Sequence, residues 1–595
     1  MSTLPRYEPI ANYGIIGNLH TTALVSLRGN IDFLCLPRFD SPSVFARILD
    51  ADKGGSFSIT CSDEDTNFKQ LYLPGTNILV TRFLTPEGIA ELTDFMPIAE
   101  DENDFAIFRR LKGIHGTHTL NINIRLAFDY ARTKGCRAVR VPDGSGYLLH
   151  DPDGEQPSLL LLTKTELTIT PEGLSGQITL SPGTDLDFIL TLPMGQDYEF
   201  DYLDQFHRTR LYWNNWLARC TYNGLWKESV LRSALTLKLL TSARFGSTVA
   251  AATFGLPEHL GGERNWDYRY TWIRDSAFTM YAFLRLGYRD EAEAFINWIQ
   301  GQCMESLQLM YGIDGRTELQ EIELDHLEGY EGSRPVRIGN GAYDQKQMDI
   351  YGELIDTIYL YNQAGGSITN EFWRGISSMV EYVIKHWKDK DHGIWEVRSG
   401  KQRFLHSAVC CWVALDRAMR IADDRSLPYP VDKWRQTRDK IYSAIYDEFW
   451  NEELGAYSQF KGSNTVDASA LLMPLLRVVS SQEPRWLKTF EMIEKKLTAD
   501  VLVFRYKNGG GSSDGLEGEE ASFTICSFWY VECMARIGRL DDATVAMQKL
   551  LGYGNHLGLF SEEIGIHGEQ LGNFPQAFSH LSLISAAFQI DKIVK

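Results

Sequence analysis

The chain has 595 residues, 44% of them hydrophobic, and its 59 basic and 78 acidic residues give a formal net charge of −19. This length predicts two or three domains with large cores. The negative excess, with no dense Lys/Arg stripe, argues against nucleic acid as a partner. The N-terminal stretch MSTLPRYEPIANYG lacks an export signal, and no apolar run reaches the roughly 20 residues that a membrane span needs. We therefore expect a soluble protein with no membrane partner.

Nine cysteines are scattered along the chain, and none forms a CxxC pair. An odd number without regular spacing is typical of reduced, mostly buried thiols, rather than of a disulfide framework or a zinc site. A cytoplasmic location is therefore expected, because the cytoplasm keeps thiols reduced.

Residues 1–201 show the pattern of an antiparallel β-sandwich. Short runs such as "ILVTRFL", "LNINIRLAF", "LLLLTKTELTIT" and "DFILTLPM" are separated by turn clusters such as "LPGTN" and "SPGTD", which predicts strands. From Tyr202 the apolar residues recur at helical spacing, in "YLDQFHRTRLYWNNWLARC". We expect residues 202–223 to form a helix that connects the β-sandwich to a helical domain over residues 224–595.

Apolar periodicity and boundary residues predict about twelve helices in the second domain. Short links follow the even-numbered helices, whereas the links after the odd-numbered ones are long and rich in Gly, aromatic and charged residues. Six helical hairpins of this kind can close into an (α/α)6 barrel with every long link at one end. An open α-solenoid is the alternative, but its repeats would resemble one another, and these do not. The expected starts are Leu225, Tyr270, Asp290, Asp349, Asn370, Leu405, Val431, Ala468, Glu483, Ala521, Asp541 and Gln576.

The first long link ends in "GGERNWDYRYTWIRDSAF", which places Arg274 and Asp275 at the start of a helix. A guanidinium beside a carboxylate matches the vicinal hydroxyls of a sugar. Aromatic side chains suit the apolar faces of a sugar ring, and this stretch carries Trp266, Tyr268, Tyr270 and Trp272. The alternative explanations are ordinary charge placement at a helix start and core packing.

Glu396 stands next to Trp395 in "GIWEVR", within the link between the fifth and sixth helices. Burial against an indole disfavours the ionised form of a carboxyl group. A carboxyl that stays protonated near neutral pH can serve as a general acid. The alternative is a local salt bridge between Glu396 and Arg398.

Two further links carry polar residues that are uninformative by themselves. The stretch "GNGAYDQKQMDIYG" contains Tyr343, Gln347 and Asp349, and Arg505 and Tyr506 stand just before "GGGSSDGLEGEE". That glycine-rich stretch has no GK[ST] and is therefore not a phosphate loop. We expect it to form a flexible flap.

The last long link carries Glu562, Glu563 and Glu569 with His567. Close acids shift one another's titration, which suits a catalytic base but also suits solvated charge. Glu396 and Glu562 occupy links that the barrel brings to one end. Two opposed carboxylates at a sugar-shaped pocket are what glycoside hydrolysis requires.

The stretches "NWDYRYTWIRDSAF", "GIWEVR" and "SEEIGIHGEQLGNFPQAFSH" resemble the barrel signatures of glycoside hydrolase family 15, the glucoamylase and trehalase-like enzymes. "PIANYGIIGNLHTTALVSLRGNIDFLCLPRFDSPSVFARIL" is similar to the N-terminal β-domain of its prokaryote-type, trehalase-like branch. The resemblance covers nearly the whole chain. It implies an inverting, exo-acting α-glucosidase on an (α/α)6 barrel, with no metal and no organic cofactor required.

By this resemblance Glu396 matches the general acid and Glu562 the general base. Arg274 and Asp275 match the pair that holds the terminal glucose. Inversion predicts that the two catalytic carboxyl groups lie about 6.5–9.5 Å apart, with room for a water. The other expected substrate contacts are Trp272, Trp395 in the Trp-Glu motif, Arg505 near the leaving-group subsite and, loosely aligned, Tyr343.

The chain departs from the secreted glucoamylases in two respects. Val397 and Arg398 follow Glu396, where those enzymes carry a second acid. No Ser/Thr-rich linker or starch-binding module follows the barrel, since the chain ends soon after "ISAAFQIDKIVK". We therefore expect small α-glucosides of the trehalose, isomaltose or maltose type as substrates, not granular starch. The linkage preference and the formation of a homo-oligomer are left open.

Two rival functions stay open. A non-catalytic glycan-binding protein would keep Arg274 and the aromatic residues but could lose either Glu396 or Glu562, and both are present. A hydrolase or lyase that acts on a uronide would use Arg398 to hold the carboxylate of its substrate.

Overall fold

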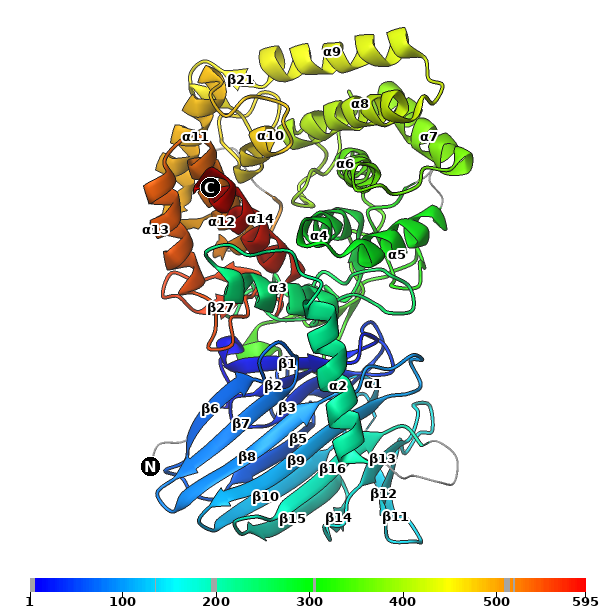
Figure 1. The fold of residues 1–595 in the computed structure, drawn as a ribbon, viewed down its shortest axis with the longest axis vertical. Helices are drawn as coiled ribbons and strands as arrows, with labels where there is room; N and C mark the ends of the chain where they lie inside the picture. Colours follow the sequence, from blue (N-terminus) through cyan, green and yellow to red (C-terminus); the bar gives the residue numbers. More distant parts are fainter. Residues whose placement is uncertain are drawn as a thin grey trace.

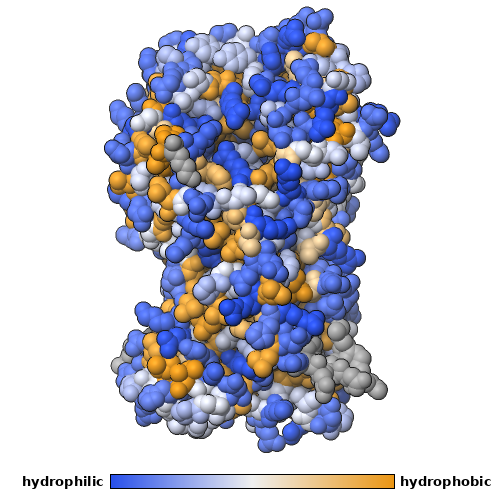
Figure 2. Space-filling view, viewed as in Figure 1, coloured by the Kyte–Doolittle hydropathy of each residue, from blue (hydrophilic) through white to orange (hydrophobic). Residues whose placement is uncertain are grey.

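The computed structural model describes residues 6–133, 135–193, 201–302, 307–507, 514–516 and 520–594. In Figure 1 a β-sandwich lies below a ring of helices, and α2 (Tyr202–Leu217) runs between them. Figure 2 shows the same two lobes joined by a narrower waist, with hydrophilic side chains over most of this face. Within these segments no helix has the length and apolarity needed to cross a membrane. The predicted order of a β-sandwich, a connecting helix and a helical region is confirmed. The domain limits drawn at residues 201 and 223 stay predictions.

The sandwich consists of two antiparallel sheets of eight strands each. The first has the order β1-β2-β3-β5-β10-β15-β14, with β4 paired to β3, and the second has the order β11-β12-β13-β16-β9-β8-β7-β6. The strands of the first sheet are β1 (Tyr13–Gly17), β2 (Thr22–Ser26), β3 (Ile31–Cys35), β4 (Ser43–Ala46), β5 (Ser56–Cys61), β10 (His118–Arg125), β14 (Thr168–Thr170) and β15 (Gly173–Leu180). Those of the second are β6 (Asn67–Tyr72), β7 (Leu79–Thr85), β8 (Gly88–Phe95), β9 (Ala106–His115), β11 (Arg137–Arg140), β12 (Gly146–His150), β13 (Leu159–Leu162) and β16 (Asp185–Thr191).

The burial pattern of a strand depends on whether one face or both faces of its sheet are covered by other parts of the protein. Side chains of β8 alternate between buried and partly exposed, as expected for a strand with one face in the core. Every residue of β1 to β4 is buried. Residues of the helical lobe, such as Leu239 and Leu557, pack against β1, so this end of the first sheet is covered on both faces.

The run "LLLLTKTELTIT", expected as one strand, is divided between the two sheets. Its first part is β13, which pairs with β16, and its last part is β14, which pairs with β15. Residues 163–167 connect the two strands, because the chain crosses here from one sheet to the other.

Aromatic side chains anchor α2 at both ends. Near its start, Tyr202 stacks on Phe206 and packs against Phe95 of the second sheet. Near its end, Trp216 stacks on Tyr288 of the helical lobe, with ring centroids 4.0 Å apart. The helix therefore ties the two lobes together.

The helices after α2 alternate between outer and inner positions, and Figure 1 shows the outer ones around the rest. The inner helices α4, α6, α8, α10, α12 and α14 contact one another in a closed ring, in which η3 (Ala468–Leu471) extends α10 and the last helix returns to the first. A closed ring confirms the (α/α)6 barrel and rules out the open solenoid. The helices are α3 (Lys227–Leu239), α4 (Ile273–Leu286), α5 (Arg289–Gln300), α6 (Ile350–Gln363), α7 (Asn370–His386), α8 (Leu405–Arg425), α9 (Val431–Glu448), α10 (Leu472–Leu475), α11 (Pro484–Leu497), α12 (Thr524–Arg536), α13 (Leu540–Leu551) and α14 (Ala577–Val594).

The observed helices begin within three residues of the predicted starts. The segment from Ala468 is much shorter than its inner neighbours. It comprises η3 and the four residues of α10, and Arg477 soon afterwards adopts a left-handed φ of 59°, which turns the chain away from helical geometry.

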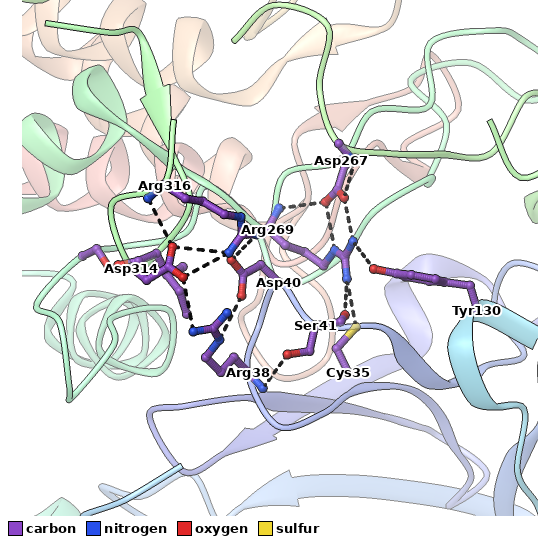
Figure 3. A network of polar contacts seen from close by, with 12 residues as sticks. Cys35, Arg38, Asp40, Ser41, Tyr130, Asp267, Arg269, Asp314 and Arg316 are labelled. Atoms are coloured by element: carbon purple, nitrogen blue, oxygen red, sulfur yellow. Dashed lines mark hydrogen bonds and ion pairs between the residues drawn. The ribbon is translucent and has the colours of Figure 1, made fainter. Parts of the chain in front are cut away.

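Three long links of the barrel, residues 240–272, 301–349 and 552–576, touch the sandwich. Figure 3 shows the contact of the first. Arg269 and Asp267 form a fully buried pair, with Nη2 and Oδ2 2.6 Å apart. The same guanidinium donates to the carbonyl of Ser41 at 2.7 Å and to the hydroxyl of Tyr130 at 3.3 Å. The sandwich therefore fixes the link that leads into Arg274.

Candidate active site

A cavity lies at the end of the barrel where the inner helices begin. Each long link leads from an outer helix to the start of an inner one, so all six links lie at this end. Five of the six contribute to the cavity lining. Representative lining residues are Tyr268, Trp272, Asn340, Glu396, Arg505 and Gln576.

Glu396 receives two hydrogen bonds on one carboxylate oxygen. The indole N–H of Trp272 donates to Oε1 at 2.8 Å, and Nη2 of Arg274 donates to the same atom at 3.2 Å. Glu396 also has a φ of 58°, in the left-handed region that costs a residue with a side chain about 1–2 kcal/mol. Backbone strain of this kind at a cavity wall points to a functional demand on the direction of the side chain.

Arg274 and Asp275 line the same cavity and are 7% and 3% exposed. Nη1 of Arg274 donates to the carbonyl of Ile394 at 2.7 Å, so its guanidinium grips the turn that carries Glu396. Its Nε lies 3.6 Å from Oδ2 of Asp275. Burial raises the pKa of Asp275 to about 7, and the charge of Arg274 opposes this shift.

Trp395 lines the cavity, but it is not the indole that bonds to Glu396. Its N–H donates to the carboxylate of Asp467 at 2.9 Å. The hydrogen bond to Glu396 comes from Trp272, which is 124 positions away along the chain. Trp395, the neighbour expected to desolvate Glu396, therefore bonds to Asp467, and Trp272 supplies the indole N–H at this carboxyl.

Arg398 pairs with an acid other than its neighbour Glu396. Its Nη2 lies 3.1 Å from Oε2 of Glu321, and its guanidinium lies over Trp266, 4.3 Å from the ring centroid. The predicted alternative of a local salt bridge to Glu396 is therefore wrong. An arginine already neutralised by Glu321 is poorly placed to hold a substrate carboxylate, so the geometry does not favour a uronide.

Glu562 is fully buried and lies behind the residues that line the cavity. The hydroxyl of Tyr268, a lining residue, donates to Oε1 of Glu562 at 2.7 Å. Burial raises the pKa of Glu562 well above its ordinary value, and the charge of Glu258 adds to the shift. Arg505 and the hydrogen bond from Tyr268 act in the opposite direction.

Arg505 is the centre of an ion-pair network in the cavity wall. Its Nη2 lies 3.1 Å from Oε2 of Glu258 and 2.9 Å from Oε1 of Glu520. Oε1 of Glu563 is 3.6 Å from the same nitrogen. Burial raises the pKa of Glu258 to about 7, while Arg505 opposes the shift and the charge of Glu520 adds to it. Three carboxyl groups thus share one guanidinium beside the cavity.

The residues in the loop before α6 differ in whether they line the cavity. Asn340 and Ala342 line the cavity, whereas Tyr343 packs against the core and is absent from the lining. Gln347 and Asp349 are buried, at 2% and 0% exposed. Most of the expected flap, residues 508–513 and 517–519, lies outside the described residues.

Sequence reasoning missed Glu258 and Glu520, and it treated Tyr268 only as an aromatic surface. Glu258 lies in "LPEHLGG", in the same long link as Arg274, and an acid in a link with Pro and a Gly-Gly pair was the available signal. No local pattern marks Glu520. Its role depends on a contact with Arg505, which lies fifteen residues earlier and meets Glu520 only in the folded chain.

One cavity at the end of the helical ring is lined by Glu396, an Arg–Asp pair and several indoles, and Glu562 bonds to its wall through Tyr268. A pair of carboxyl groups at a sugar-sized cavity is what a glycoside hydrolase requires. The chain belongs to glycosyl hydrolases family 15, whose family model matches residues 224–588. A second model, described as "Trehalase-like, N-terminal", matches residues 5–200. The resemblance found in the sequence is confirmed.

Known relatives align along nearly the whole chain. It is 36% identical to a trehalase of Mycolicibacterium smegmatis, over 98% of this chain and 91% of that protein. It is 37% identical to a trehalase of Thermoplasma acidophilum, over 96% of this chain and 98% of that protein. A bacterial glucoamylase solved in complex with acarbose has the same fold, with a TM-score of 0.71 at 13% identity over 99% of this chain and 96% of that one.

Proposed function

We propose that this glycoside hydrolase is an exo-acting, inverting α-glucosidase and that trehalose is its preferred substrate. Two relatives at 36% and 37% identity are trehalases. The observation that carries the proposal is a chain of contacts between the two remote acids. Trp272 contacts Glu396, its ring packs edge-on against Tyr268 with centroids 5.4 Å apart, and Tyr268 contacts Glu562 in turn.

Glu396 acts as the general acid. It gives its proton to the glycosidic oxygen as the bond from that oxygen to the anomeric carbon breaks. Trp272 and Arg274 both donate to Oε1, which leaves Oε2 as the oxygen that carries the proton. These two contacts also hold the carboxyl in one orientation, as proton transfer requires.

Glu562 acts as the general base. It removes a proton from the water that attacks the anomeric carbon from the opposite face, so an α-glucoside yields β-glucose. Only the ionised carboxylate accepts a proton, and the raised pKa of Glu562 therefore sets an acidic limit on activity. Tyr268 and Arg505 favour the ionised form and bring that limit down.

Two aromatic rings in series between Glu396 and Glu562 support the inverting outcome. Inversion needs carboxyl groups about 6.5–9.5 Å apart, because a water must fit beside the anomeric carbon. Direct contact between the acids would leave no such space. Glu396 and Glu562 bond to two different side chains, Trp272 and Tyr268, whose rings pack edge-on.

Arg274 and Asp275 bind the hydroxyls of the terminal glucose. Both are almost fully buried, which supports a cavity closed at this end and hence exo action on the end of a substrate. Trp272 and Trp395 provide apolar surface for the sugar ring. Arg505, held by its acids, stands on the side of the leaving group.

We also place the enzyme in the cytoplasm, with a small carbohydrate as its partner. The cysteines of the described segments are free thiols, and most of them are buried. Thiols of this kind are typical of a reducing compartment.

A release assay on trehalose, kojibiose, nigerose, maltose and isomaltose, with proton NMR of the first products, tests the proposal. We expect the fastest release from trehalose. Inversion predicts equal initial amounts of α- and β-glucose from it, because the leaving glucose keeps its α configuration. Initial formation of α-glucose alone would overturn inversion, and hydrolysis of maltose without hydrolysis of trehalose would overturn the substrate. Calorimetric binding of trehalose without turnover would indicate a glycan-binding protein.

A further inference from the structure

A second buried cluster of titratable side chains lies between α6 and α8. Asp349 precedes α6 directly and Glu353 follows it by four residues, and α8 carries His406 and Cys410 at the same spacing. A spacing of four residues puts each pair on one face of its helix. All four residues are outside the cavity lining, and the proposed hydrolysis does not use them.

Glu353, His406 and Cys410 each offer one ligand atom, and these three atoms all lie within 4.8 Å of one another, with Asp349 beside His406. Nε2 of His406 lies 3.2 Å from Oε1 of Glu353 and 3.4 Å from Sγ of Cys410. The same nitrogen lies 3.8 Å from Oδ2 of Asp349. In a tetrahedral zinc site, with bonds of about 2.0–2.3 Å, neighbouring ligand atoms are about 3.3–3.7 Å apart. The distances from Nε2 of His406 to Glu353 and Cys410 are close to that spacing, and the distance to Asp349 is slightly longer.

Gly352 allows the two helices to approach each other at this point. It lies on α6 between Asp349 and Glu353, and a Cβ added to it would come within 2.1 Å of the carbonyl oxygen of Cys410. Any side chain here would push α6 and α8 apart. The glycine therefore sets the helix separation at which two facing pairs of ligands can meet.

The cluster has hydrogen-bonding capacity that its surroundings leave unused, although the charge of Arg274 acts on both of its carboxyls. Asp349 is fully buried, and neither of its carboxylate oxygens has a hydrogen-bond partner. Oε2 of Glu353, which is 3% exposed, also has none. Buried carboxylates without partners are costly, and a bound dication removes that cost.

We propose that Asp349, Glu353, His406 and Cys410 form a closed site for a divalent transition metal, of which Zn²⁺ fits best. A thiolate and an imidazole favour Zn²⁺, whereas Mg²⁺ and Ca²⁺ take oxygen ligands. Binding releases the thiol proton of Cys410, and any proton on the carboxyls, to solvent. Four protein ligands leave no coordination position for a water or a substrate, so the metal has a structural role and clamps α6 to α8.

The spacing of the ligands along the chain hides this site. Zinc sites are recognised in sequences by close Cys and His pairs such as CxxC. Here one helix supplies two carboxyls and the other, more than fifty residues later, supplies the imidazole and the thiol. Only the contact between α6 and α8 brings the two pairs together.

Metal analysis of the full-length protein tests the proposal. The chain is produced in Zn²⁺- or Co²⁺-supplemented medium, freed of loosely bound metal on a chelating column, and analysed by elemental mass spectrometry. We expect about one ion per chain. The Co²⁺ form should show tetrahedral d–d absorption and a thiolate-to-cobalt charge-transfer band. A chain free of stoichiometric metal after both preparations would overturn the proposal.

Cys410→Ser and Cys411→Ser form a matched pair of variants. Cys411 is the next residue of the same helix and is equally buried, but its Sγ faces the carbonyl of Met348. Cys410→Ser should lose the charge-transfer band and most of the retained metal, whereas Cys411→Ser should keep both. An unchanged cobalt spectrum in Cys410→Ser would overturn the assignment. Circular dichroism checks folding, and Asp349→Asn, which keeps the side-chain shape, should also lose metal if Cys410→Ser does not fold.

Discussion

The hydroxyl of Tyr268 donates a hydrogen bond of 2.7 Å to Oε1 of Glu562. Tyr268 lines the cavity and Glu562 does not, so the tyrosine hydroxyl connects this buried carboxyl to the cavity wall. On its other side the ring meets Trp272, whose indole bonds to Glu396. A substitution of Tyr268 should therefore affect both proposed catalytic acids.

Replacement of either acid by its amide should abolish most of the turnover. We expect Glu396→Gln and Glu562→Gln each to lower kcat on trehalose about 10²–10⁴-fold, because each loses a proton-transfer group while its size is kept. Glu569→Gln is the control, since Glu569 lies in the same link as Glu562 but is only partly buried. It should change kcat by about twofold at most. Normal turnover in either acid variant, with circular dichroism showing a folded protein, would remove that residue from its role.

Glu258→Gln should move the acidic limb of the pH profile to lower pH. The negative charge of Glu258 raises the pKa of Glu562. Without that charge the base ionises at lower pH, so activity persists further into the acidic range. The measurement is kcat/KM on trehalose against pH, which reports the ionisation of the free enzyme. An acidic limb that stays in place or moves upward would contradict the assignment of Glu562 as the base.

Tyr268→Phe should shift the same limb in the opposite direction. The hydrogen bond from Tyr268 favours the ionised form of Glu562 and lowers its pKa. Loss of the hydroxyl raises that pKa. As the pH falls, the variant should therefore lose activity at a higher pH than the unmodified enzyme does. Loss of one hydrogen bond to a charged group, worth about 1.5–3 kcal/mol, should also reduce kcat/KM about tenfold or more. Equal shifts in both variants would show that the titrating group is not Glu562.

Arg269→Met should destabilise the protein much more than a matched surface change. It leaves Asp267 buried without its ionic partner, which costs about 3–5 kcal/mol. Arg140→Met is the control, because Arg140 and its partner Glu166 are both largely exposed and such pairs contribute about 0–1 kcal/mol. Differential scanning calorimetry should show a clearly lower Tm for Arg269→Met only. Equal Tm values would mean that the contact between sandwich and barrel in Figure 3 contributes little.

Local patterns in the sequence were sufficient for the order of sandwich, connecting helix and barrel and for the starts of the barrel helices. Short runs between turn clusters marked the β-sandwich, and helical periodicity placed the starts of the barrel helices within three residues. Link lengths predicted the closed ring, because a short link forces neighbouring helices to be antiparallel. The motifs around Arg274, Glu396 and Glu562 were also readable, since each lies within a few residues of a helix start or a turn.

Contacts between links were decided only in the folded chain. Trp272, and not the adjacent Trp395, bonds to Glu396, and Arg398 turns to Glu321. Arg505 gathers acids from three separate links. Which partner a side chain meets depends on the packing of helices more than fifty residues apart, and no local pattern records it.

By itself the sequence determined the family, through its motifs, and the sandwich and the paired-helix barrel. Burial of one face requires apolar residues to recur along the chain at the spacing of a strand or a helix. Only the tertiary structure decided that Tyr268 bonds to Glu562, that Arg269 joins the lobes and that α6 and α8 bring Glu353, His406 and Cys410 together. These relations follow from backbone approach and side-chain direction across the core. The packing of the whole chain sets both the backbone approach and the side-chain directions. At Gly352, for example, the absence of a Cβ allows α6 and α8 to lie close together.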